Sequence, residues 1–116
     1  MHKISLNYPW FDLMKNGKKI YEGRRNNDKI KKINIGDTLK VTHHIDKNIE
    51  PFYVIVDEIL NFATFRDALT HLPISEILPI DNIDIEKGVS IYLNYVSLQT
   101  QLIDGIVMLK VHNINM

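Results

Sequence analysis

The sequence contains no cysteine, so it can form no disulfide and offers no thiolate as a nucleophile or zinc ligand. Nothing in it therefore requires an oxidising compartment. It also lacks a run of about 18 apolar residues, the length that a membrane-spanning helix needs, and residues 1–7 lack the apolar centre of a signal peptide. We expect an intracellular protein, cytoplasmic or nuclear, that has no membrane partner.

The chain also has no net charge, because its 14 Lys and Arg balance its 14 Asp and Glu. The balance hides an asymmetry along the chain. Residues 1–49 hold eleven cations against five acids, whereas residues 50–104 hold nine acids against two cations. Eight cations lie within residues 15–32, a density that suits a phosphate-bearing partner as well as a solvated face. The acidic half could instead dock a basic protein partner.

The secondary structure expected from the sequence mixes short strands with short helices. No repeat, low-complexity tract or linker rich in Gly, Pro or Ser divides the chain, so we expect one domain over residues 1–116. Period-two patterns and apolar runs predict strands over residues 3–6, 19–25, 38–42, 52–56 and 106–111. Helical spacing and capping residues predict helices near residues 9–16, 64–72 and 84–96, with single turns within 26–32 and 75–78. The fold class expected is α+β, a small mixed β-barrel with short helices in its connections.

The densest chemistry lies in residues 16–25. Here Gly17, Lys19, Glu22 and Arg24 follow one another with the spacing G-x-K-x-x-E-x-R. This pattern resembles the motif of the ASCH domain family, the activating signal cointegrator homology domain, whose fold is a PUA-like β-barrel. The flanking segments are also similar to the family's short helix, its I-x-x-G-D turn and its closing strand, and they are residues 8–14, 35–38 and 104–107. The resemblance therefore covers nearly the whole chain.

The resemblance implies binding of RNA, DNA or a nucleotide, with roles near transcription and translation. It implies that Lys19, Glu22 and Arg24 line a cleft of the barrel. The residue types suit that role, because Lys supplies a point charge for phosphate, Arg a planar fork for phosphate or a base edge, and Glu an acceptor for an exocyclic amine. Four neighbours in the sequence are expected to add charge or aromatic surface to the same binding site: Lys18, Arg25, Tyr8 and Trp10.

Strand alternation places a condition on this cleft. Glu22 and Arg24 share one face of a strand, while Lys19 would point to the other face. For Lys19 to reach the same cleft, it must lie at the very start of the strand, or a bulge must shift the alternation. The alternative is an exposed Glu22–Arg24 pair on the barrel wall, with Lys19 in solvent. Such a pair would contribute little to stability, roughly 0–1 kcal/mol.

The resemblance is also compatible with an enzymatic function. One subgroup hydrolyses acylated cytidine amides with a Lys, a Thr in place of the motif's Glu, and a Glu from a later helix. The corresponding catalytic residues would be Lys19, Glu22 and Glu76, but position 22 carries no hydroxyl, so the nucleophile of that scheme is missing. A ribonuclease is the other option. The five histidines have no zinc-ligand spacing and no Gly-rich phosphate loop is present, so we expect neither a metal nor a cofactor.

Overall fold

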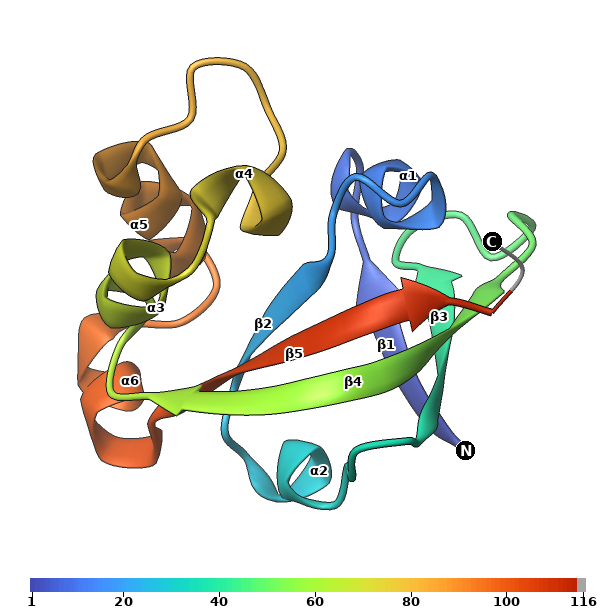
Figure 1. The fold of residues 1–116 in the computed structure, drawn as a ribbon, viewed down its shortest axis with the longest axis horizontal. Coiled ribbons are helices and arrows are strands. Elements are labelled where there is room, and N and C mark those ends of the chain that lie inside the picture. Colours follow the sequence, from blue (N-terminus) through green and yellow to red (C-terminus); the bar gives the residue numbers. More distant parts are fainter. Residues whose placement is uncertain (115–116) are drawn as a thin grey trace.

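The computed structural model describes residues 1–114, in which five strands form one curled, mixed sheet in the order β1-β3-β4-β5-β2 (Figure 1). The strands are β1 (His2–Leu6), β2 (Tyr21–Arg25), β3 (Thr38–His43), β4 (Phe52–Phe62) and β5 (Ile106–Asn113). The β1–β3 pair is parallel, and the other three pairs are antiparallel. The α+β class expected from the sequence is confirmed, and the sheet has the shape of a half-barrel.

The two edges of this sheet, β1 and β2, are joined by a side chain. Arg24 of β2 donates a hydrogen bond from Nη2 to the carbonyl oxygen of Ser5 in β1, at 2.8 Å. Edge strands present backbone groups that have no ladder partner, and this bond satisfies one of them. We call the open side of the half-barrel between β1 and β2 the seam. An arginine of the sequence motif therefore bridges the seam.

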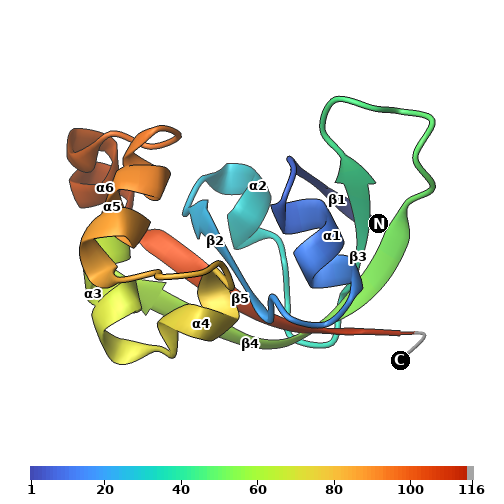
Figure 2. The same ribbon diagram turned by 90° about the horizontal axis from the view of Figure 1, so that it is seen from above.

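Helices fill the connections between strands. They are α1 (Trp10–Lys15), α2 (Asp28–Lys31), α3 (Phe65–His71), α4 (Ile74–Ile77), α5 (Ile85–Leu93) and α6 (Leu98–Asp104). Asn27, Thr64, Asp84 and Ser97 each accept a hydrogen bond from a first-turn N–H, the usual device for starting a helix. Figure 2 shows α3 to α6 gathered at one end of the sheet, with α1 lying near β1 and β3. Within residues 1–114, none of the helices has the length and apolar character needed to cross a membrane.

The central strand β5 is apolar on both faces because it separates two hydrophobic clusters. Its residues Val107, Leu109 and Val111 pack inside the curled sheet with α1 and α2. The alternate residues Ile106 and Met108 pack against the helical layer of α3 to α5. The prediction of a central strand over residues 106–111 is confirmed, and the reason is burial on both sides.

The start of β2, the end of β4 and the helix α6 differ from what the sequence predicts. The strand β2 begins at Tyr21 and not at residue 19, because the amides of Lys18 and Lys19 bond to the Leu13 carbonyl at the end of α1. The strand β4 continues past residue 56 to Phe62, across a shift in its pairing with β5 at Asp57. Helix α6 was not expected. Its apolar residues Leu98, Leu102 and Ile103 are exposed, and its buried residue is the polar Gln101.

Candidate functional site

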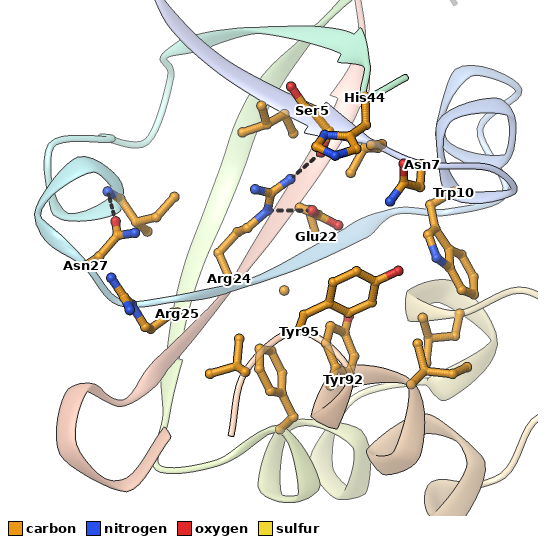
Figure 3. A pocket seen from close by; sticks show the side chains of 18 of the residues that line it. Ser5, Asn7, Trp10, Glu22, Arg24, Arg25, Asn27, His44, Tyr92 and Tyr95 are labelled. Carbon is orange, nitrogen blue, oxygen red and sulfur yellow. Dashed lines mark hydrogen bonds and ion pairs between the residues drawn. The ribbon is translucent and has the colours of Figure 1, made fainter. Parts of the chain in front are cut away.

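A cleft opens along the seam, between β1 and β2 on one side and α5 on the other (Figure 3). Its volume is about 640 Å³, within the range of roughly 300–1,000 Å³ that small-ligand sites occupy. We call it the seam cleft, and its lining includes Asn7, Trp10, Glu22, Arg24, Tyr92 and Tyr95. It draws residues from the first 25 positions and from α5, so neither segment alone could form it.

Lys19 lies two residues before the start of β2 and is buried, with 3% of its surface exposed. Gly17, whose φ is 85°, turns the chain after α1 and so directs Lys19 inward. The ammonium group donates to the carbonyl oxygen of Ile77 at 2.5 Å and lies 3.5 Å from Oε1 of Glu22. It also lies 5.6 Å from the centre of the Trp10 ring, a cation–π distance. Because Lys19 precedes the strand, strand alternation does not keep it away from Glu22.

Glu22 is the centre of a charged chain that crosses the seam. Its side chain is 8% exposed, and its Oε2 accepts a hydrogen bond from Arg24 Nε at 2.7 Å. Figure 3 shows the Arg24 guanidinium in the middle of the cleft, between Glu22 and Ser5. Glu22 therefore receives one cation on each oxygen, Lys19 on the buried side and Arg24 on the open side. The arrangement is a buried network and not an exposed pair on the barrel wall.

Burial decides the protonation chemistry of Lys19. Loss of solvent lowers the pKa of its ammonium group below 10.5, and Arg24 acts in the same direction, while Glu22 opposes the shift. Desolvation is the largest of these effects because the charged form has lost water on all sides. An anion that entered the cleft near Lys19 would favour its protonated form.

Tyr92 of α5 reaches the cleft through the space left by Gly23. A Cβ at Gly23 would lie 2.8 Å from the Tyr92 hydroxyl and 2.9 Å from atoms of Met108 and Phe65, so a larger residue would force them apart. The Tyr92 ring stacks on Phe65 with centroids 4.0 Å apart. Burial, then Glu22, raises the pKa of the Tyr92 phenol, and Arg24, then a hydrogen bond with the Gly23 backbone, offset part of that rise. The phenol therefore stays protonated at neutral pH.

The rim of the cleft is basic and aromatic. Arg25 and Lys29 both line it and are exposed. Arg25 makes an ion pair with Asp104 at 3.5 Å, with 45% of the Arg25 side chain exposed. On the opposite side, Tyr95 is 61% exposed and stands at the mouth of the cleft (Figure 3).

The structure brings together five of the residues that the sequence singled out: Trp10, Lys19, Glu22, Arg24 and Arg25 line the cleft. Among the residues described, three others lie outside that lining: Tyr8, Lys18 and Glu76. Tyr8 and Lys18 are exposed. Glu76 contributes its backbone instead, since its carbonyl oxygen accepts from the Ile20 amide at 2.8 Å.

Several cleft residues were not identified from the sequence. Asn7 and His44 have no motif that marks them, and Tyr92 and Tyr95 have the helical spacing of ordinary core and surface residues. The one available signal was Gly23 in the middle of the motif, since a glycine inside a strand often marks a close approach by another group. Over residues 1–114, no three His, Asp or Glu side chains are placed to hold a metal ion together.

Comparison with known proteins agrees with this fold. The family model of the ASCH domain matches residues 4–113. The structure is similar to that of the hypothetical protein PH0355, at a TM-score of 0.84 and 26% identity over 97% of both chains. It is also similar to the protein PF0455 from Pyrococcus furiosus, at a TM-score of 0.78 and 23% identity over 99% of this chain and 98% of that one.

A more distant likeness connects the chain to a longer protein. A point mutant of ZmASCH from Zymomonas mobilis superposes with a TM-score of 0.66 and 12% identity, over 95% of this chain and 67% of that one. At this identity the likeness shows the fold alone. None of the curated proteins matches the sequence.

Proposed function

The chain belongs to the ASCH domain family, and we propose that its seam cleft binds single-stranded RNA or DNA, with one nucleotide lodged between Arg24 and Tyr95. The observation that carries the proposal is the Arg24 guanidinium. It is held in the cleft by Glu22 and Ser5, yet 30% of its side chain is exposed. A guanidinium fixed in this way has N–H groups left for a phosphate or a base edge and loses little entropy on binding.

The rim supplies attraction for the phosphate backbone. Arg25 and Lys29 are exposed at one end of the cleft. Binding of a polyanion to such cations releases counterions, which makes the affinity fall as salt rises. The neutral net charge of the chain limits attraction at long range, but the field at the cleft is set by these nearby cations.

The opposite wall supplies a surface for stacking. Tyr95 is exposed at the mouth of the cleft, where its ring can receive the face of a base. Stacking of a base on an aromatic side chain contributes about 1–3 kcal/mol and tolerates any base. Arg24, the basic rim and Tyr95 together fit a nucleotide unit with its phosphate toward Arg25 and its base inside the cleft.

We expect replacement of Lys29 by alanine to weaken binding of a ten-nucleotide RNA and to reduce the slope of log affinity against log salt by about one. The measurement is fluorescence anisotropy at several salt concentrations. The matched control is Lys31→Ala, which removes the same charge from the same short helix at a position outside the cleft lining. An equal effect of both variants would contradict a binding site in the seam cleft.

One observation favours a second candidate, hydrolysis of RNA or of a modified nucleoside. The lowered pKa of the buried Lys19, beside Glu22, is the kind of shift found in acid–base catalysis. The side chain of Glu76, the third residue expected for that chemistry, lies outside the cleft lining within the described part of the chain. Products formed from RNA or from an acylated cytidine, and lost in Lys19→Met, would favour this candidate over simple binding.

A further inference from the structure

Helix α6 buries a polar side chain and exposes apolar ones. Gln101 is 3% exposed. Its Oε1 accepts a hydrogen bond from the Phe65 amide at 2.9 Å, and its Nε2 donates to the Val96 carbonyl oxygen at 3.1 Å. Both ends of the buried amide are therefore paired, and they fix how the helix is rotated against the rest of the protein. A helix on the surface of a monomer usually has the opposite arrangement, with its apolar residues inside.

The apolar residues of α6 form one exposed surface. Leu98, Leu102 and Ile103 are 54%, 64% and 73% exposed. Leu98 and Leu102 are four residues apart and so lie next to each other on the helix, and Ile103 follows directly. We call these three residues, with the exposed Gln99, the α6 face. It lies at the outer end of the molecule, far from β1 and β3 (Figure 1), and an exposed apolar patch of this kind marks an interaction site.

The chemistry around the α6 face limits what can cover it. Residues 88–103 contain no Lys, Arg, Asp, Glu or His, and no other stretch of the chain without charge is as long. The next residue, Asp104, is paired with Arg25 at 3.5 Å. A polyanion or a charged peptide would find no opposite charge on this surface. Two identical copies could meet here without repulsion between like charges, and loss of charged residues is typical of the centre of such interfaces.

We propose that the α6 face pairs with the α6 face of a second copy of the chain, in a dimer with two-fold symmetry. Such a contact uses the same surface of both copies, so it needs no second complementary patch. A standard interface uses about 20–30 residues a side, more than residues 88–103 supply. We therefore expect a reversible dimer with a dissociation constant in the micromolar range. The four residues of the α6 face lie outside the lining of the seam cleft, so the pairing is independent of the proposed function.

The test is sedimentation velocity of the full chain without nucleic acid, at protein concentrations from about 5 to about 500 μM. We expect the mass to rise from one chain to two across this range. Leu102→Lys should weaken the dimer at least about tenfold, because each copy would bring a cation into an apolar contact. A lysine is favourable near the end of a helix, so α6 should persist, and circular dichroism checks the fold. Leu98→Gln, which adds no charge, should weaken the dimer about threefold or more.

Ile35→Lys is the matched control. Ile35 is 65% exposed, close to the 64% of Leu102, and lies in the turn before β3. It gains the same charge away from α6, so its dissociation constant should equal that of the native protein. Raising the salt concentration should leave the native dimer as strong or stronger, since the contact contains no ion pair. A single-chain mass at every concentration, an unchanged dimer in Leu102→Lys, or a dimer that salt dissociates would overturn the proposal.

Discussion

Replacing Glu22 by glutamine is expected to lower the free energy of unfolding by about 3 kcal/mol at neutral pH. The reason is that Glu22 faces the buried ammonium of Lys19 at 3.5 Å as well as Arg24 at 2.7 Å. Glutamine keeps the shape and an acceptor oxygen but removes the charge that compensates Lys19. A buried cation without its partner is costly because it has already lost its water. Urea denaturation followed by circular dichroism measures the change.

The effect should depend on pH in one direction. Burial holds the folded-state pKa of Lys19 below its ordinary value of 10.5. Between the folded-state pKa and about 10.5 the unfolded chain binds more protons than the folded one, so the contribution of Lys19 to stability rises with pH across that window. Removing Glu22 lowers the folded-state pKa further and extends the window downward. The loss in Glu22→Gln should therefore be smaller at pH 9.5 than at pH 7.

Two further variants separate this network from a general effect of charge. Lys19→Met combined with Glu22→Gln should recover part of the stability lost in Glu22→Gln, because the uncompensated cation is gone. Glu86→Gln, which removes a carboxylate from the exposed ion pair with Arg66, should leave stability unchanged within error. A loss in Glu22→Gln that is the same at both pH values would contradict the account of Lys19.

Replacing Arg24 by alanine should weaken RNA binding by about 10- to 100-fold, from the loss of charge-assisted hydrogen bonds worth about 1.5–3 kcal/mol. In the proposed site Arg24 contacts the ligand directly, and in the structure it also joins the two edge strands through its hydrogen bond to Ser5. Arg24→Lys should have an intermediate effect. A lysine keeps the charge, but it has no planar guanidinium that can bond to Glu22 and Ser5 and still offer N–H groups to a ligand. Isothermal titration calorimetry measures both affinities.

The control for Arg24 is Arg66→Ala. Arg66 also makes an ion pair, with Glu86, but it lies on α3 and outside the cleft lining. Its replacement should leave the affinity for RNA unchanged. Native affinity in Arg24→Ala, with the fold confirmed by circular dichroism, would contradict a ligand held at the seam.

Local patterns in the sequence were sufficient for most of the fold. The alternation in β3, the helix start near Thr64, the cap at Asp84 and the two-sided apolar run of β5 each depend on a few neighbouring residues, and each was predicted. The start of β2 was misplaced because hydrogen bonds to the end of α1 replace strand pairing for two residues. The end of β4 was missed because a shift in pairing at Asp57 is a property of two strands together.

The residues of the candidate site also fall into two groups, those that the sequence could indicate and those that only the folded structure reveals. Lys19, Glu22 and Arg24 are close in sequence, so their spacing could indicate a shared cleft. Tyr92 joins them across about 70 residues of chain through a contact that only Gly23 permits. The spacing of residues in the sequence cannot reveal such a contact. It also cannot reveal the burial that lowers the pKa of Lys19. The charged half of the site could therefore be predicted, while its aromatic and neutral polar half could not.

The most direct test of a nucleic-acid site at the seam is a titration of the ¹⁵N-labelled protein with a single-stranded RNA, followed by NMR. The account predicts that the largest shifts occur at the backbone amides of Gly23, Arg24 and Arg25, at the Arg24 Nε–H and in the segment around Tyr95. Shifts confined to other exposed cations, such as Lys31 and Lys47, with those signals unmoved, would contradict it.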